Sequence, residues 1–340
     1  MRVTLRDVAR QVGVHPSTVS RVLNPATRGM VSSEIAERVT ETARALGYRP
    51  NPIAYGLRTN RSFTIGVVLP DLTNPVFPPM VRGIEATLEA AGYTAIIANT
   101  DNDPTRAGKI IDIMRSRQVD GLIVGTARLD DPLVTECLED GIPLVLINRR
   151  VEDGRIPSVA ADSAVGMSAV VHHLVGLGHR RIAHIAGPQY LSTGRARLRG
   201  VRNALAAHGI ADDPALIVYG ESFTVEEGRR CTDQLIDSGA AFTAIVCAND
   251  LLAIGCYESL DRHGRACPGD VSVTGYNDIR FMDKLRPPLT TVRIPTHEIG
   301  TEAARTLLER MRDPATPARE VRLEPELIVR GSTGPAKGAG

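Results

Sequence analysis

Apolar positions near the N-terminus recur at helical spacing in two short segments on either side of Gly13. The first segment places its apolar residues on one face: Leu5, Val8, Ala9 and Val12. Thr4 precedes this segment and Asp7 follows three residues later, which is a short acidic form of the capping box. Gly13 can adopt the left-handed conformation that ends a helix, so the pattern predicts a helix over about residues 5–12.

The second segment opens with Pro16, which suits the first position of a helix because its missing N–H has no partner there. Its apolar residues face inward: Val19, Val22 and Leu23. Its outward residues are short hydroxyls around one long planar cation: Ser17, Thr18, Ser20 and Arg21. A helix that enters a DNA groove needs hydroxyls for phosphates and a guanidinium for a guanine edge. The alternative is a small amphipathic helical pair on an ordinary surface.

A third helix is predicted over Ser32–Leu46, with Ser32 as its cap and Gly47 at its end. Pro50 and Pro52 then mark a boundary. The next segment, Ile53–Arg58, could form one or two helical turns that would be marginal alone, since isolated short helices do not hold in water.

From Phe63 onward the pattern changes to short Ile- and Val-rich strands that alternate with helices, as parallel strands buried on both faces should. The first set of predicted strands is Phe63–Leu69, Tyr93–Ala98, Gly121–Gly125 and Leu144–Ile147. The helices between them are Pro75–Ala91, Thr105–Gln118 and Pro132–Glu139.

A second set of strands follows: Val159–Ala161, Ile182–Ala186, Leu216–Tyr219, Ala244–Cys247 and Val271–Gly275. Its helices are Ser163–Leu177, Thr193–His208, Thr224–Ser238 and Leu251–His263. A strand at Thr291–Ile294 and a helix to about Arg312 are expected to return to the first half. The fold class predicted is therefore α/β: a helix-turn-helix headpiece followed by two doubly wound α/β subdomains with a cleft between them.

Polar side chains follow the predicted strands at their carboxyl ends, where ligands sit in such sheets. The set combines amides, arginine and aromatic rings, which suits a small polyhydroxylated or polar ligand. Two alternatives stay open. Asn249 and Asp250 could cap the following helix, and for Asp250 capping is favoured over ligand binding, whereas Phe77 and Phe223 could be core residues. A buried Arg197 would need a partner, and Asp250 or Asp278 could supply it.

The net charge of +1 hides an asymmetry. Residues 1–61 hold ten Arg, no Lys and four acids, which gives +6, so the remainder carries −5. A basic head on a mildly acidic body is typical of local nucleic-acid binding, and a solvated basic face is the alternative.

Motifs of common enzyme classes are missing from the sequence, including the P-loop, the G-x-S-x-G elbow and H-E-x-x-H. The five Cys are scattered and the eight His do not cluster, so no metal, cofactor or disulfide framework is indicated. The N-terminus lacks the apolar run of a signal peptide, and no apolar stretch reaches the roughly 20 residues of a membrane helix. We therefore expect a non-enzymatic, cytoplasmic protein with no membrane partner.

The headpiece resembles that of the LacI/GalR family of bacterial transcription regulators. The shared motifs are Thr4, Asp7-Val8-Ala9, Gly13-Val14, Thr18-Val19-Ser20-Arg21-Val22-Leu23-Asn24 and Leu46-Gly47-Tyr48-Arg49-Pro50-Asn51. The resemblance extends from about residue 3 to about residue 332. The chain departs from the family pattern in five places: Val12 for a common Ala, His15 for a Ser that caps the second helix, Gly56 for a more usual Ala or Ser, Val76 for an aromatic residue and Asn277 for an Asp.

The resemblance implies that the two α/β subdomains form a periplasmic-binding-protein-like effector domain, and it implies a set of binding residues. It implies headpiece 1–49, a hinge helix or linker 50–60, an effector-binding and dimerisation domain 61–332, and a flexible tail 333–340. Within the domain, it implies an N-subdomain of about 61–160 plus 293–320 and a C-subdomain of about 161–292 plus 321–332. The DNA-binding residues implied are Thr4, His15, Pro16, Ser17, Thr18, Ser20, Arg21, Asn24, Tyr48, Asn51, Ala54, Leu57 and Arg58. The effector-binding residues implied are Asn74, Phe77, Asn148, Thr193, Arg197, Phe223, Asn249 and Asn277.

The resulting hypothesis is a ligand-responsive repressor that binds a pseudo-palindromic double-stranded operator as a homodimer and responds to a small polar effector, such as a sugar. In the hinge, Leu57 matches a family Leu that wedges into the minor groove. The alternatives are a solute-binding protein without a transcriptional role and a DNA enzyme with a helix-turn-helix head, such as a recombinase. The missing signal peptide and the basic head oppose the first, and the lack of an evident active site opposes the second.

Overall fold

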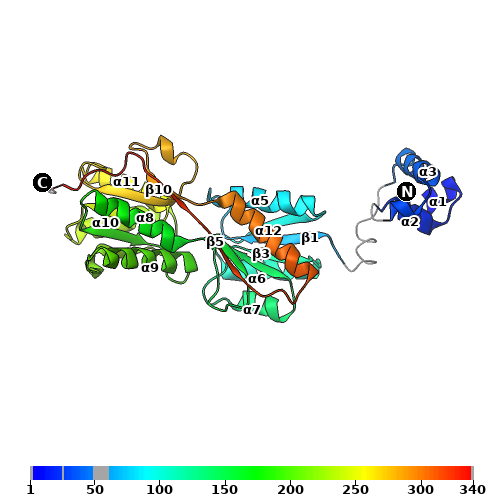
Figure 1. The fold of residues 1–340 in the computed structure, drawn as a ribbon, viewed down its shortest axis with the longest axis horizontal. Coiled ribbons are helices and arrows are strands. Elements are labelled where there is room, and N and C mark those ends of the chain that lie inside the picture. The colour runs from blue at the N-terminus through cyan, green and yellow to red at the C-terminus, as the bar shows by residue number, and fades with distance from the viewer. Residues whose placement is uncertain (1–2, 25–26, 49–60, 338–340) are drawn as a thin grey trace. The chain divides into compact units, whose positions relative to one another are not determined.

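A computed structural model describes residues 3–24, 27–48 and 61–337 of the chain (Figure 1). The chain divides into two compact units, residues 1–62 and residues 63–340. Each unit has its own hydrophobic core, and each is described by itself below.

The first unit, the headpiece, is built from three α-helices and a short 3-10 turn in its described part. Their bounds are α1 (Leu5–Val12), α2 (Pro16–Val22), a 3-10 turn (Arg28–Met30) and α3 (Ser33–Ala45). The small apolar residues of all three helices form one core: Val8, Ala9, Val12, Val19, Val22, Ala36, Val39 and Ala43. This arrangement confirms the predicted helix-turn-helix with a supporting third helix.

Local signals in the sequence determine where α1 begins and ends, whereas Ser32, the predicted cap of α3, makes no side-chain capping hydrogen bond. The backbone N–H of Thr4 donates to the Asp7 carboxylate at 2.9 Å, and the Asp7 N–H donates back to the Thr4 hydroxyl at 3.4 Å. This is the predicted capping box. Gly13 has φ of 76°, and its N–H donates to the carbonyl of Ala9, so α1 ends in the left-handed conformation that glycine adopts without strain.

The second unit alternates strands and helices through most of its length. Its strands are β1 (Thr64–Leu69), β2 (Thr94–Asn99), β3 (Gly121–Val124), β4 (Leu144–Ile147), β5 (Ser158–Ala161), β6 (Ile182–Ala186), β7 (Ile217–Tyr219), β8 (Ala244–Cys247), β9 (Ser272–Asn277), β10 (Thr290–Arg293), β11 (Glu320–Leu323) and β12 (Glu326–Ile328). Its α-helices are α5 (Phe77–Ala90), α6 (Pro104–Ser116), α7 (Pro132–Glu139), α8 (Ser163–Gly176), α9 (Ser192–Ala207), α10 (Val225–Asp237), α11 (Asp250–Arg262) and α12 (Thr296–Arg312).

The first sheet has the strand order β11-β5-β4-β3-β1-β2, and its paired strands are all parallel. Helices α5 and α12 lie side by side on one face, and α6 and α7 lie on the other (Figure 1). Within β1, Ile65, Val67 and Leu69 join the core under α5 and α12, whereas Val68 joins the core under α6 and α7. Both faces of the strand are therefore buried, which explains its continuous apolar run.

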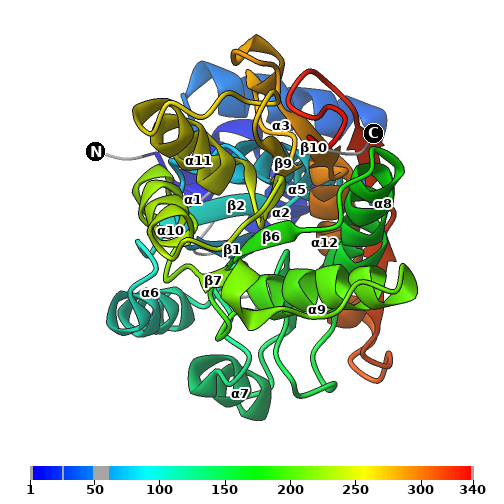
Figure 2. The ribbon, with the colours of Figure 1, turned by 90° about the vertical axis from the view of Figure 1, so that its left-hand side faces the viewer.

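The second sheet has the order β12-β10-β9-β8-β6-β7, with β12 antiparallel to β10 and the remaining pairs parallel. Helices α8 and α9 contact each other, as do α10 and α11, and Figure 2 shows these two pairs on opposite sides of the sheet. The predicted fold class, two doubly wound α/β subdomains behind a helix-turn-helix headpiece, is confirmed.

The chain passes between the two sheets three times, and two of our strand assignments were wrong. Strand β5 pairs with β4 and β11 in the first sheet, although we grouped it with the second set. Strand β10 pairs with β9 in the second sheet, although we expected the return to begin before it. The helix after it, α12, does return and packs against α5. The hydrophobic pattern of a segment indicates that it is a buried strand, but it does not indicate to which sheet the strand belongs.

The C-terminal segment also differs from expectation. Strand β11 lies in the first sheet, although the resemblance assigned residues 321–332 to the C-subdomain. Residues 333–337 are attached to the second sheet and its helices, which corrects the flexible tail for this stretch. The Gly334 carbonyl accepts from the His179 ring at 3.0 Å, and the Ala336 N–H donates to the carbonyl of Leu177 at 2.9 Å.

Candidate functional site

Helix α2 presents a polar surface on the side away from the headpiece core. Val19 and Val22 are buried in that core, whereas Ser17 and Arg21 are exposed. Arg21 is the one Lys or Arg within α2, as the sequence predicts. The surface therefore combines a long guanidinium with short hydroxyls, the chemistry that suits a DNA groove.

His15 caps the start of α2. Its Nδ1 accepts the backbone N–H of Ser17 at 3.2 Å and lies 2.8 Å from the Ser17 hydroxyl. Because Nδ1 acts as the acceptor, a neutral ring carries its proton on Nε2. His15 thus supplies the cap for which family members often use Ser, and it adds an N–H donor at the tip of the helix.

The other predicted DNA-binding residues fall into three groups. Thr4 is exposed at the cap of α1, and Pro16, Thr18, Ser20 and Asn24 are partly buried in or just after α2. Tyr48 packs against the headpiece core just after α3. Asn51, Ala54, Leu57 and Arg58 lie outside the described residues.

A cleft of about 110 Å³ lies at the carboxyl ends of strands from both sheets of the second unit. All eight predicted effector-binding residues line it: Asn74, Phe77, Asn148, Thr193, Arg197, Phe223, Asn249 and Asn277. They follow strands β1, β4, β6, β7, β8 and β9, so the strand-end rule brings distant parts of the sequence together.

The amide side chains of the cleft have distinct local roles. The Asn249 oxygen accepts from the Leu252 N–H at 2.9 Å and caps α11, and the Asn74 oxygen accepts from the Val76 N–H at 3.2 Å before α5. Asn148 and Asn277 have φ of 64° and 117°. Positive φ is uncommon outside glycine and gathers at ligand sites, where surrounding structure holds it.

Arg197 is buried on the first turns of α9 and reaches into the cleft. Its Nη1 donates to the carbonyl of Ala248 at 2.7 Å, and its Nη2 donates to the Asn277 side-chain oxygen at 3.4 Å. The guanidinium lies 4.0 Å from the centroid of the Tyr276 ring and 5.8 Å from that of Phe223. Burial lowers the pKa of Arg197 from its ordinary value.

The expected acidic partners of Arg197 are engaged elsewhere. Asp250 accepts the Ile279 N–H at 2.8 Å and the Thr291 hydroxyl at 2.5 Å. Asp278 pairs with Arg293 and Arg330, each at 2.8 Å. Our expectation that either acid pairs directly with Arg197 was therefore wrong, although the charge of Asp250 still acts on Arg197. Of the two residues that could cap α11, Asn249 does so and Asp250 does not.

Aromatic rings form an apolar part of the cleft. Phe77 is both a core residue and a lining residue, so its two alternatives are not exclusive. Phe223 lies directly over Gly187, where an added Cβ would meet the ring at 2.4 Å. A residue larger than glycine at 187 would displace the ring from the cleft wall.

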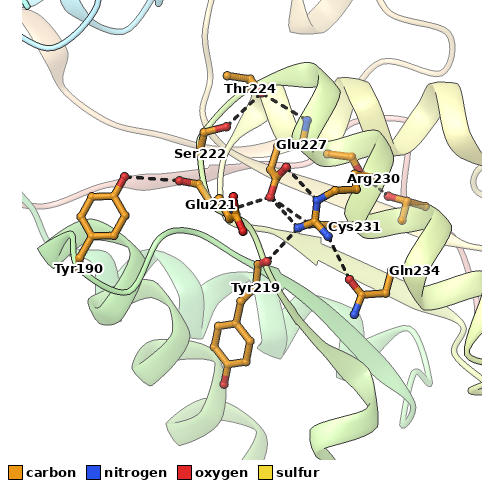
Figure 3. Close-up of polar contacts among 11 residues, drawn as sticks. Tyr190, Tyr219, Glu221, Ser222, Thr224, Glu227, Arg230, Cys231 and Gln234 are labelled. Carbon is orange, nitrogen blue, oxygen red and sulfur yellow. Dashed lines mark hydrogen bonds and ion pairs between the residues drawn. The ribbon is translucent and has the colours of Figure 1, made fainter. Parts of the chain in front are cut away.

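The loop that carries Phe223 is held by an ion pair on α10 (Figure 3). The Glu227 carboxylate accepts from Nε and Nη2 of Arg230 at 3.0 and 2.6 Å, and it also accepts the Glu221 N–H at 2.7 Å. Arg230 Nη2 donates further to the carbonyl of Tyr219 at 3.1 Å. The network therefore connects the first turns of α10 to both ends of the segment that leads to Phe223.

Sequence reasoning missed several lining residues, above all Arg149 and Asn102. Arg149 is buried, with 7% of its surface exposed, and follows Asn148 directly at the end of β4. The strand-end rule that selected Asn148 applies equally to its neighbour, so the signal was present in the sequence.

Taken together, the cleft offers paired amide donors and acceptors, guanidinium groups and flat apolar walls, which is suited to binding rather than to catalysis. Within the described residues, no group of three or more His, Cys, Asp or Glu could hold a metal ion. Over the same residues, no helix is both long and apolar enough to span a membrane.

Comparison with known proteins identifies both units. Residues 4–51 match the model of bacterial regulatory proteins of the lacI family, and residues 171–333 match that of a periplasmic binding protein-like domain. The chain is 35% identical to the HTH-type transcriptional repressor CytR of Escherichia coli (strain K12) over 331 residues, which is 97% of this chain and 96% of CytR. The chain belongs to the LacI family. It is a DNA-binding transcription regulator and not an enzyme.

Solved structures of the LacI family have the same fold. The lac repressor dimer bound to operator and the anti-inducer ONPF gives a TM-score of 0.87 at 28% identity, covering 98% of this chain and 100% of the other. The complex of the transcriptional regulator CelR with cellobiose gives a TM-score of 0.74 at 33% identity, covering 97% of this chain and 100% of the other. The sequence-based assignment to the family is thus confirmed.

Proposed function

We propose that this LacI-family protein is a repressor that binds a pseudo-palindromic operator as a dimer, with one headpiece on each half-site. Helix α2 reads the major groove through Arg21, and its hydroxyls contact phosphates. The CytR relative, named a repressor, and the lac repressor dimer on its operator support this assignment. A regulator of this kind acts on chromosomal DNA, so we place it in the cytoplasm.

The second part of the proposal concerns the cleft, which we assign to a small polar effector, a sugar or a sugar derivative. The observation that carries it is that the eight residues implied by the family resemblance all line one cavity. The cellobiose complex of CelR shows a related protein with a saccharide and supports this ligand class. Binding changes the relative pose of the two subdomains and thereby the operator affinity of the headpieces.

The hinge is part of the same proposal, although its residues lie outside the described part of the chain. Leu57 inserts into the minor groove when two hinge segments order on the operator. Leu57→Ala should then weaken specific binding while leaving dimerisation and ligand binding intact. Gly56→Ala should tighten operator binding, because alanine favours a helix over glycine by roughly 0.5–1 kcal/mol per chain.

A gel-shift assay with genomic fragments, with and without candidate sugars, tests the proposed function. We expect selective retention of a few fragments that contain inverted repeats, and a change in retention when an effector is added. Sedimentation of the free protein should give the mass of a dimer. Sugar binding without any sequence-selective DNA retention would favour the alternative, a solute-binding protein.

A further inference from the structure

Two buried arginines line the cleft from its two sides. Arg149 follows strand β4 of the first sheet, and Arg197 lies on α9 beside the second sheet. Their exposed fractions are only 7% and 4%. A guanidinium stays charged at neutral pH, so burying it without a counter-charge costs free energy.

The contacts of Arg149 within the described residues are weak and neutral. Its Nη1 donates to the carbonyl of Thr126 and its Nη2 to the side-chain oxygen of Asn102, both at 3.3 Å. Its Nε is buried without a hydrogen-bond partner in the described structure. Burial is the main reason that the pKa of Arg149 falls to about 10, and the charges of Arg128 and Arg197 act in the same direction. Arg149 and Arg197 therefore repel each other across the cleft.

The carboxylates around the cleft are already engaged. Asp250 and Asp278 hold the groups described above, and Asp71 accepts from the N–H and hydroxyl of Thr73 at 2.8 and 2.6 Å. Arg197 itself makes its direct contacts with a carbonyl, an amide and an aromatic ring, and the charge of Asp250 acts on it without forming an ion pair. The cleft thus concentrates positive charge in a desolvated site, where a bound anion interacts strongly.

We infer that the effector is an anion, with a phosphate ester or a carboxylate on a polyhydroxylated body, and that Arg149 and Arg197 bind its charged group. The inference rests on the proposed function and narrows its ligand class. The amides of Asn74, Asn249 and Asn277 then take the hydroxyls. The charged group lies in the cleft and not in the neighbouring cavity of about 190 Å³ that Arg149 also lines, because Asp103, Asp130 and Asp131 line that second cavity.

Calorimetric titration with matched probes tests the inference on the intact protein. The probes are inorganic phosphate and two sets of neutral sugar, sugar phosphate and sugar acid: D-ribose, ribose 5-phosphate and ribonate, and D-glucose, glucose 6-phosphate and gluconate. We expect at least one anion to bind about tenfold or more tightly than its neutral counterpart, since charge-assisted hydrogen bonds exceed neutral ones by about this much. The phosphate and acid arms distinguish the two sources of charge.

Arg149→Met tests the residue itself, with Arg128→Met as the matched control. Arg128 is exposed over Tyr190 and lines the neighbouring cavity but not the cleft. We expect Arg149→Met to lose about tenfold or more in affinity for the anion and to keep the affinity for the neutral sugar, and Arg128→Met to change neither. The melting temperature of ligand-free Arg149→Met should equal or exceed that of wild type, because an unpaired buried charge is removed.

Several results would overturn the inference. The first is that the wild type binds each neutral sugar as tightly as, or more tightly than, the matching anions. The second is that no anion binds at about 10 mM. A lower melting temperature of Arg149→Met with unchanged preference for the anion would make Arg149 structural. These results differ from failure of the proposed function, which the gel shift reports separately as a loss of sequence-selective DNA retention.

Discussion

The guanidinium of Arg197 lies over the ring of Tyr276, 4.0 Å from its centroid, where the sequence led us to expect an aspartate. Tyr276 is a fully buried residue of β9, so the ring is a rigid platform. A cation on an aromatic face is oriented without being neutralised. Arg197 is therefore fixed in place and keeps its charge for a ligand.

Arg197→Ala should weaken effector binding by about tenfold or more and leave operator binding intact, so that the protein responds poorly to the effector. Losing a hydrogen bond to a charged group costs about 1.5–3 kcal/mol. Calorimetry with the effector and a gel shift with the operator measure the two properties. Arg195→Ala is the control, since Arg195 is an exposed neighbour on α9 that pairs with Glu152. Unchanged ligand affinity in Arg197→Ala would remove Arg197 from the site.

Arg21→Ala should weaken operator binding by about 1–3 kcal/mol and relax preference at one base pair, because Arg21 is the cation that α2 exposes. Binding to operator variants and to random DNA measures both effects. Arg44→Ala, on the exposed surface of α3, is the control for simple loss of positive charge. Equal losses on operator and random DNA would make Arg21 a phosphate contact.

Asn249 has two roles that a pair of substitutions can separate. Asn249→Ala removes the cap of α11 and should cost about 1 kcal/mol of stability in addition to ligand affinity. Asn249→Ser retains a capping oxygen but shortens the side chain, so it should keep stability and lose ligand affinity. Thermal unfolding and calorimetry measure the two properties. Full ligand affinity in Asn249→Ser would restrict Asn249 to capping.

Glu227→Gln should lower effector affinity although Glu227 is not a lining residue. The change removes the charge that holds Arg230 and thereby loosens the segment that carries Phe223 (Figure 3). Calorimetry should show weaker binding with operator affinity unchanged. Glu258→Gln is the control, because Glu258 forms an exposed ion pair with Arg229 between α10 and α11. Equal effects of both changes would indicate a general loss of stability.

Ionisation of Asp250 should lower the free energy of unfolding as pH rises. Burial raises its pKa from an ordinary 3.8 to about 6. The native state therefore binds more protons at this group between pH 4 and pH 6, so its contribution to stability is greatest below pH 4 and is lost as pH rises through 6. The loss is about 3 kcal/mol.

Asp250→Asn provides the comparison for that pH effect, since an amide does not titrate there. Other groups change the stability of both proteins alike, so the difference in melting temperature between variant and wild type isolates Asp250. We expect this difference to move in favour of the variant from pH 4 to pH 7. Movement in the opposite direction would show that ionised Asp250 stabilises the fold.

The sequence predicted the positions of helices and strands better than it predicted which strands pair with each other. Strands such as β1 were found because burial on two faces gives a continuous apolar run, and helices such as α5 were found because burial on one face gives a helical periodicity. Strands β11 and β12 were missed, because both are short, partly exposed edge strands that lack a continuous apolar run. Membership of a sheet depends on contacts between distant segments, which local pattern does not contain.

The candidate site was predictable to the extent that strand ends converge. Asn148 was found and Arg149 was missed, although one rule covers both. The engagements of Asp250 were not predictable, because Ile279 and Thr291 come from other strands and loops. The type of a residue indicates which groups it can bind, but tertiary structure determines which group it contacts.

The pairing of β11 with β5 has a consequence for the growing polypeptide. The ribosome synthesises the N-terminus first, so the first sheet lacks its edge strand β11 until Leu323 has been added. The headpiece core, in contrast, is complete at Tyr48. During synthesis the headpiece can therefore fold long before the unit that contains the cleft. Prematurely terminated chains would then contain a folded headpiece without the effector-binding unit that regulates it.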